Sequence, residues 1–262
     1  MKHNLKITIL LLALFLAAHL IGLFVLQGYQ SREYPYGFAP PEIRDTTTSV
    51  VDIVISIAIM TLVILILIKF RARRIWKTWF LLSLVITLLL SLAAFIPAFY
   101  ALIIAVALGL WRILKNNVYL HNFTEVFVYG GLASLFVPIL NLVSISILLI
   151  AIAVYDYWAV FKSKHMVKMA EFQRENKVFA GLFVPYGKKA AILGGGDIGF
   201  TLLFSGVILQ KFGFLAALIS SLIIAGSLLA LFLIGKKNKY YPAMPFLAGG
   251  CFIALGVVWL VF

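Results

Sequence analysis

Long apolar runs separated by short polar segments make up most of this chain. A bilayer-spanning α-helix needs about 20 mostly apolar residues, and by that measure the pattern predicts about nine spans. The first run is too long for a signal peptide, and no small-residue cleavage site follows it. We therefore expect an all-α membrane protein with helices at 5–27, 49–69, 76–96, 98–114, 118–138, 141–161, 190–210, 213–235 and 241–262.

Composition supports a membrane protein with almost no soluble domain. Hydrophobic residues make up 64% of the chain and charged residues 12%, with a mean hydropathy of +1.10. Soluble domains carry roughly a quarter charged residues. The single cysteine, Cys251, lies in the last apolar run and leaves no intrachain disulfide to consider.

The net charge of +13 is informative through its distribution. If the N-terminus is cytoplasmic and the spans alternate, 19 of the 22 basic residues fall on the inner side, and only Arg32, Arg44 and Lys211 fall outside. This positive-inside bias predicts a cytoplasmic N-terminus and an outer C-terminus. The basic clusters suit anionic lipid headgroups and argue against nucleic-acid binding.

Most acidic residues lie in loops, and two near span ends have ordinary explanations. Asp52 follows Ser49 by three positions, which is a capping-box pattern. Glu125 follows His121 by four positions, so the two share a helical face and predict a local pair near the interface.

Two further aspartates lie inside consecutive antiparallel spans. Asp156, in "AVYDYWAVFK", is about 9 Å from the boundary marked by Lys162, and Asp197, in "LGGGDIGFTLLF", is about 12 Å past Lys189, at 1.5 Å per residue. No Lys or Arg lies at that depth. Two close carboxylates in a low dielectric share one proton, which is the charge state that general acid–base attack of water on an amide requires.

The glycines before Asp197 favour close packing. Gly194, Gly195 and Gly196 remove side chains around the preceding turn, so a second backbone can approach. Gly195 and Gly199 also form a small-xxx-small step that suits tight packing against a neighbouring helix.

Three motifs, taken in order, resemble the presenilin and signal peptide peptidase family of intramembrane aspartyl proteases. They are "YD" in the sixth span, "GGGD" fitting G-x-G-D in the seventh, and a Pro-Ala motif that opens the ninth. The resemblance covers the nine-span layout and implies a presenilin-like bundle in which Asp156 and Asp197 form the catalytic dyad. It implies that substrate is positioned by Tyr155, Gly194, Gly195, Gly196, Pro242, Ala243 and Met244.

This chain departs from the family pattern in two ways. Met244 replaces the leucine of the Pro-Ala-Leu motif, which keeps size and apolarity. No long insertion separates the two catalytic helices, so the chain looks closer to compact microbial homologues. We accordingly expect a multi-pass protein of a microbial plasma membrane.

The predicted layout has two parts. Residues 1–140 hold helices one to five, and residues 141–262 hold the four catalytic helices with a cytoplasmic loop at about 162–189. In that loop, 178–187 is uncharged and too short to span. It either lies on the interface or forms an edge strand that pairs with an unwound substrate helix.

The function expected is hydrolysis of peptide bonds within transmembrane helices of membrane-protein substrates. One alternative is a transporter or ion-leak pathway that uses intramembrane acids, although we find no repeated halves. Another is a prepilin-peptidase-like aspartyl protease, which would not need the Pro-Ala turn. Neither H-E-x-x-H nor G-x-S-x-G occurs, so we expect no metal and no cofactor. Nothing in the sequence requires an accessory subunit.

Overall fold

The computed structural model describes residues 4–40, 55, 59, 63, 73–115, 117–163, 179–186, 189–235 and 241–262. The long helices of this part of the chain are α1 (Leu5–Tyr29), α3 (Arg73–Ala93), α4 (Ala98–Leu114), α5 (Val118–Phe136), α6 (Leu142–Trp158), α8 (Gly195–Phe212), α9 (Phe214–Ile234) and α10 (Met244–Val261). Short 3₁₀ turns at Pro35–Gly37 and Val137–Ile139 follow α1 and α5, and a π-helical turn at Ala159–Ser163 extends α6. Strands β1 (Gly181–Tyr186) and β2 (Lys189–Gly194) lie between α6 and α8.

The helices fall where the apolar pattern predicts them, with one error. The prediction of a helix from residue 190 was wrong, because 189–194 form β2 and α8 begins only at Gly195. Six of the described helices are long and apolar enough to cross a membrane, and α4 is a shorter apolar helix. The predicted span 49–69, with the proposed Ser49–Asp52 cap, lies outside the described residues apart from three isolated positions.

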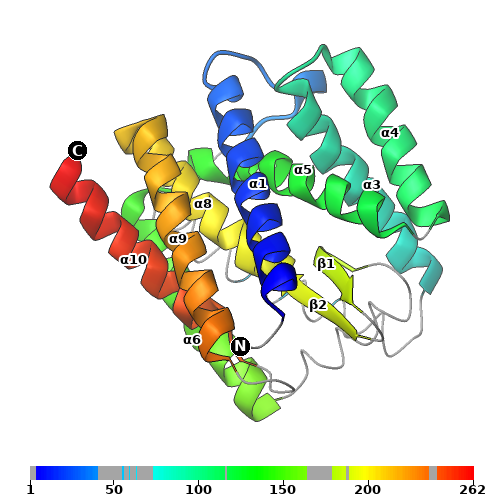
Figure 1. Cartoon of the computed structure of the whole chain (residues 1–262). Helices are drawn as coiled ribbons and strands as arrows, with labels where there is room; N and C mark the ends of the chain where they lie inside the picture. Colours follow the sequence, from blue (N-terminus) through cyan, green and yellow to red (C-terminus); the bar gives the residue numbers. More distant parts are fainter. Residues whose placement is uncertain are drawn as a thin grey trace.

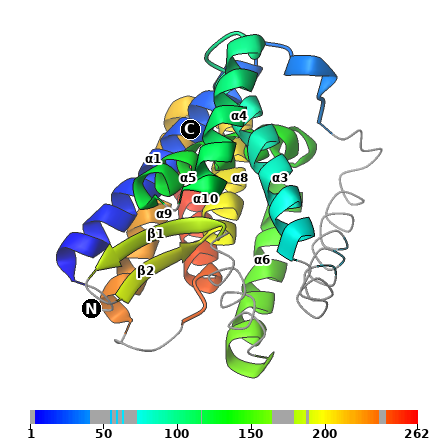
Figure 2. The ribbon, with the colours of Figure 1, turned by 90° about the vertical axis from the view of Figure 1, so that its right-hand side faces the viewer.

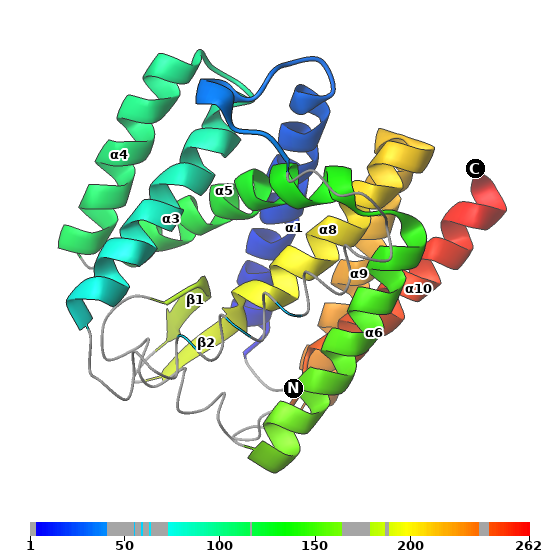
Figure 3. The same ribbon diagram turned by 180° about the vertical axis from the view of Figure 1, so that it is seen from behind.

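The helices pack as one bundle with α1, α5 and α8 in its middle. Figure 1 shows α3 and α4 on one side and α9 and α10 on the other, and α6 is seen best from behind in Figure 3. α1 packs against α5, α8 and α9, and α10 packs against α6, α8 and α9. The N-terminal helix therefore lies against the predicted catalytic helices.

Small residues allow the closest contacts in this bundle. A Cβ on Gly131 of α5 would lie 1.9 Å from the backbone oxygen of Thr87 in α3, so only glycine fits there. The main core joins side chains of α1, α5, α6, α8, α9, α10 and the hairpin, and a smaller core joins α3 to α4. Such close approach is how membrane helices gain packing energy, because lipid offers no hydrophobic drive between them.

The hairpin is an antiparallel pair at the end of the bundle where α1 begins (Figure 2). Its register pairs Leu182 with Leu193 and Val184 with Ala191. These four side chains share one face, since strand side chains alternate, and all are buried in the main core. The opposite face carries Ile192, which is exposed.

Candidate active site

Asp156 lies near the end of α6 and reaches the start of α10. Its side chain is buried, and its Oδ2 accepts a hydrogen bond of 3.1 Å from the backbone N–H of Met244. Met244 is the first residue of α10, where backbone N–H groups have no partner within the helix. The carboxylate therefore caps a helix whose first residue lies 88 positions later in the chain. The N-terminus of a helix favours a negative charge.

Asp197 occupies the first turn of α8 and is half-buried. Its side chain folds back over the start of the helix, because a Cβ on Gly194 would lie 3.2 Å from its Oδ2. Like Asp156, it stands at the positive end of a helix dipole. The partial positive charge of a helix N-terminus therefore stabilises each carboxylate.

The three glycines before Asp197 have different neighbours. Gly194 is the N-cap of α8 and the last residue of β2. A Cβ on Gly195 would lie 3.1 Å from the Tyr129 hydroxyl and 3.3 Å from the backbone oxygen of Ala180. A Cβ on Gly196, which is exposed, would meet only the ring of Phe200, at 3.6 Å. The first two glycines therefore serve contacts within the chain.

The predicted small-xxx-small step also has a partner in the structure. Gly195 and Gly199 both face Tyr129, whose Cδ1 would lie 4.0 Å from a Cβ on Gly199. The neighbouring helix is therefore α5, and an aromatic side chain fills the space that the two glycines leave.

The Pro-Ala-Met turn is the start of α10. Pro242 and Met244 are buried, and Ala243 is the N-cap, with φ −85° and ψ −35°. Pro245 follows at a position where a missing N–H costs nothing. The first N–H of the helix is the one that Asp156 holds.

The predicted site residues lie on or beside three helices. α6, α8 and α10 pack against one another in pairs. Asp156 meets Met244 beside Ala243, and Asp197 lies over Gly194. Tyr155 precedes Asp156 on α6 and is partly exposed, and its ring centre lies 6.5 Å from that of Trp158.

The apolar segment between the catalytic helices is a strand, and its outer edge is occupied. Side chains of α5 hydrogen-bond the backbone of Gly181 and Phe183, so these residues face away from β2. The third outward position is Pro185, which has no N–H to offer. By the antiparallel pattern, Ala190, Ile192 and Gly194 point their backbone groups outward from β2. In the described chain no third strand covers that edge.

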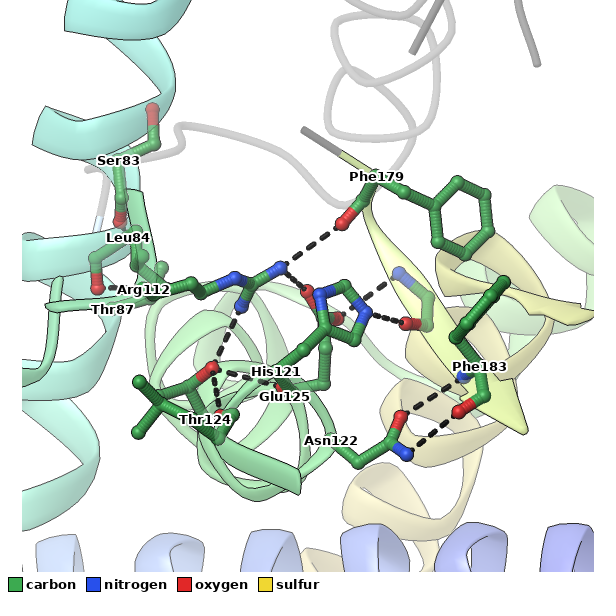
Figure 4. A network of polar contacts seen from close by, with 12 residues as sticks. Ser83, Leu84, Thr87, Arg112, His121, Asn122, Thr124, Glu125, Phe179 and Phe183 are labelled. Carbon is green, nitrogen blue, oxygen red and sulfur yellow. Dashed lines mark hydrogen bonds and ion pairs between the residues drawn. The ribbon is translucent and has the colours of Figure 1, made fainter. Parts of the chain in front are cut away.

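The expected local pair of His121 and Glu125 was wrong, because each binds a different partner (Figure 4). Glu125 pairs with Arg112 of α4, with Nη2 and Oε1 2.5 Å apart and both side chains buried. His121 Nε2 donates to the backbone oxygen of Gly181 at 2.8 Å. A shared helical face makes a pair possible, but a buried guanidinium is the stronger partner for a buried carboxylate.

A second buried polar group lies behind Asp197. His19 of α1 has Nε2 3.1 Å from the Thr201 hydroxyl and Nδ1 3.0 Å from the Ser221 hydroxyl of α9. The Thr201 hydroxyl lies 2.7 Å from the backbone oxygen of Asp197 and donates to it. This chain ties the first turn of α8 to two neighbouring helices.

Sequence reasoning missed Arg112, Tyr129 and His19 as neighbours of the site. A usable signal existed for Arg112, because Arg112 and Glu125 carry opposite charges and lie only 13 residues apart on two consecutive helices. No such signal marks His19, whose partners lie 182 and 202 residues away. In the described residues no group of three His, Cys, Asp or Glu side chains is placed to hold a metal.

Comparisons with known proteins agree with this geometry. The family model for signal-peptide peptidase and presenilin aspartyl proteases matches residues 7–199, a stretch that contains Asp156 and Asp197 and ends before the Pro-Ala-Met turn. No curated protein sequence matches.

Two solved structures have the same fold over almost the whole chain. One is a presenilin family intramembrane aspartate protease in space group C222, with a TM-score of 0.71 and 23% identity over 97% of this chain and 99% of that one. The other is a presenilin family intramembrane aspartate protease in space group P2, with a TM-score of 0.69 and 24% identity over 96% and 97%.

The family match covers well over half of the chain, and the fold match covers nearly all of it. These findings favour the protease over a transporter or an ion-leak pathway. The chain belongs to the signal-peptide peptidase and presenilin family of aspartyl proteases and is an intramembrane protease of the aspartic type.

Proposed function

We propose that Asp156 and Asp197 are the catalytic dyad and that they cut peptide bonds in transmembrane helices of other membrane proteins. The observation that carries this proposal is the packing of α6, α8 and α10 against one another, with a direct contact between α6 and α10 at Asp156. The carboxylate of α6 binds the first N–H of α10, and both helices pack against α8, whose first turn holds Asp197.

The proposed chemistry is general acid–base attack by water. The two carboxyl groups share one proton, because two negative charges at close range in a low dielectric are costly. The ionised group takes a proton from water as the water oxygen attacks the substrate carbonyl. The protonated group donates to the oxygen on which charge develops. The carboxyl group that took the proton from water then gives it to the nitrogen of the scissile bond as the C–N bond breaks, and the former carbonyl oxygen returns its proton to the other carboxylate.

The substrate must expose its backbone before it can react. A transmembrane helix keeps its amides in intrahelical hydrogen bonds, and these need replacement partners when the helix unwinds inside the bilayer. The outward backbone groups of Ala190, Ile192 and Gly194 are suitable partners, because β2 has an open edge and leads directly into α8. We therefore assign substrate pairing to β2, since α5 occupies the edge of β1.

Gly196 and the start of α10 complete the proposed substrate site. Gly196 is exposed, lies between the outer edge of β2 and Asp197, and a Cβ there would meet only the ring of Phe200, at 3.6 Å. Met244 binds Asp156 through its backbone N–H, and Pro242 and Ala243 directly precede it at the start of α10. In this scheme the catalytic residues lie within 141–262, and the helices of 1–140 pack against them and hold them in place.

We further propose that the N-terminus is cytoplasmic and the C-terminus outside, in a microbial plasma membrane. The positive-inside distribution of the basic residues supports this orientation. Substrates would then be helices whose own N-terminus is outside. No step of the scheme requires an accessory subunit.

The direct test replaces each aspartate by asparagine, which keeps the shape and can still accept the Met244 N–H. Asp156→Asn and Asp197→Asn should each abolish cleavage of a fluorogenic single-span substrate in detergent, while the thermal unfolding temperature stays near that of wild type. The double variant should lose no more than either single one, because the pair acts as a unit. Substantial cleavage by either single variant would refute the assignment. Ion flux into liposomes without any cleavage would favour a transport role.

A further inference from the structure

The first two turns of α5 bind the outer edge of β1 as a neighbouring strand would. The Asn122 side-chain amide accepts from the Phe183 N–H at 2.9 Å and donates to the Phe183 oxygen at 2.7 Å. The next outward residue, Gly181, donates its N–H to Glu125 Oε2 at 3.1 Å and accepts from His121 at 2.8 Å. Figure 4 shows these side chains directed at the strand. The edge of β1 is thereby closed to a substrate.

Glu125 is the centre of this cluster. Its Oε1 accepts from Arg112, and its Oε2 accepts from Gly181 and, at 2.5 Å, from the Tyr129 hydroxyl. Arg112 also donates to the Thr124 hydroxyl at 2.8 Å and to the Phe179 oxygen at 2.9 Å. The chain segment just before β1 is therefore held at Phe179 as well as at Gly181.

The cluster extends to the helix of Asp197 through Tyr129. The Tyr129 hydroxyl that binds Glu125 lies 3.1 Å from the position of a Cβ on Gly195, and its ring lines the side of α8 at Gly199. Gly195 in turn donates its N–H to the Ala180 oxygen at 3.3 Å. α5 therefore holds both neighbours of β2: β1, which lies beside it, and the start of α8, which follows its last residue.

Stability alone does not explain why the ion pair of Arg112 and Glu125 is buried. The desolvation of two charges offsets much of their attraction, and well-packed apolar pairs often replace buried ion pairs without loss of stability. What charged and hydrogen-bonded groups provide better is a fixed direction, because each bond demands a geometry. The bonds here fix the strand beside β2 relative to the turn that holds Asp197.

We propose that Glu125, with Arg112, Asn122 and Tyr129, is a set of positioning residues that determines which peptide bond is cut. The argument rests on the proposed pairing of substrate with β2. The hairpin sets the register of a substrate strand on that edge, and Asp197 marks the point at which a peptide bond is cut. The α5 cluster, which is Asn122, Glu125 and Tyr129 of α5 with Arg112 of α4, fixes the distance between the hairpin and Asp197. It therefore sets the cleavage position.

The test compares cleavage positions in matched variants. Glu125→Gln removes the charge but keeps the shape, and Asn122→Ala removes both bonds to Phe183. Arg112→Met combined with Glu125→Met removes the ion pair without leaving a lone charge. Leu88→Ala is the control, because Leu88 is buried in the small core of α3 and α4 and the substitution lowers stability there. The measurement is mass spectrometry of the products from one single-span substrate.

In wild type we expect one dominant cleavage site. In the α5 variants the ratio of products displaced by two residues to the main product should rise about tenfold, because a two-residue slip keeps each strand face in place. Leu88→Ala should slow all products equally. Product ratios unchanged in all three α5 variants, with rates that fall only as stability falls, would overturn the proposal.

Hydrogen exchange separates this proposal from the proposed function. Peptides that cover 179–194 should exchange faster in Glu125→Gln and Asn122→Ala than in wild type, and those that cover α9 should not change. Equal exchange of the hairpin in all proteins would show that the cluster does not hold it. A wild-type protein that cleaves nothing would refute the proposed function, and with it the claim on cleavage position, whatever the exchange shows.

Discussion

At the scale of single residues, the two aspartates differ in what surrounds them. Asp156 is buried and holds the backbone of another helix, whereas Asp197 is half-buried and lies over its own N-cap. Both stand at helix N-termini, where a carboxylate gains about 0.3–1 kcal/mol, and up to about 2 kcal/mol when partly buried. That gain lowers the cost of placing two carboxylates inside a bundle.

The glycines of "GGGD" give a matched pair of substitutions. Gly195→Ala places a methyl group 3.1 Å from the Tyr129 hydroxyl and 3.3 Å from the Ala180 oxygen, and overpacking of this kind costs about 1–3 kcal/mol. We expect its unfolding temperature to fall by several degrees. Gly196→Ala meets nothing closer than 3.6 Å, and alanine is the better helix former, so stability should be kept or raised.

Activity should separate the same two variants. If substrate backbone passes Gly196, Gly196→Ala should raise KM or lower kcat by about tenfold, since a displacement of about 1 Å can cost on the order of 100-fold. The measurements are thermal unfolding and cleavage rate at matched protein concentration. Full activity in Gly196→Ala would mean that substrate does not approach this face of α8.

At the scale of elements, α10 depends on where its first turn begins. Pro242 bars regular helix at the residue before it and cannot supply an N–H, so the helix starts at Met244 and presents that N–H to Asp156. Pro242→Ala should let the helix extend by about a turn and displace this contact. We expect cleavage to fall by about tenfold or more with little change in stability.

Met244→Leu is the control for that substitution. It conserves volume and leaves the backbone N–H in place, so its cleavage rate should stay close to wild type. If Pro242→Ala cleaves as fast as wild type at matched thermal stability, the proline turn has no role beyond starting a helix. The function would then depend on the two aspartates alone.

The open edge of β2 is tested by removing one donor. Ile192→Pro takes away an outward N–H that the hairpin does not use, and proline is compatible with an edge strand. The loss of one net hydrogen bond, about 1 kcal/mol, should weaken substrate binding about fivefold. Ile192→Val, which keeps the N–H, should bind as wild type does. Equal KM values for the two variants would exclude substrate pairing at this edge.

The elements also mark the limit of the sequence analysis. Apolar runs located most of the described helices. The strand at 189–194 was missed because "AAILGGG" continues an apolar run, and a short run cannot distinguish strand from helix. The contacts of Glu125 with Gly181 and of Asp156 with Met244 depend on how helices pack, which no local pattern encodes.

At the scale of the whole molecule, the two ends of the bundle differ. Figure 1 shows the start of α1 and the hairpin at one end and the C-terminus at the other. α4 and α6 end at the hairpin end, with Arg112 and Lys115 at the end of α4. Lys211 lies in the last turn of α8, which runs the other way from the hairpin. Among the described residues, the end that holds the hairpin and the proposed dyad is therefore the more basic one.

This polarity predicts that the hairpin end faces the cytoplasm, because basic residues are retained on that side. The single cysteine, Cys251, is buried, so Cys251→Ala gives a background free of thiols. Lys6→Cys and Arg32→Cys then place one exposed thiol at each end of α1. In intact cells a membrane-impermeant maleimide should label Arg32→Cys, and Lys6→Cys should react only after the cells are broken. Phe262→Cys, at the far end from the N-terminus, should behave like Arg32→Cys. Labelling of Lys6→Cys in intact cells would reverse the assigned orientation, and with it the expectation that substrates enter with their N-terminus outside.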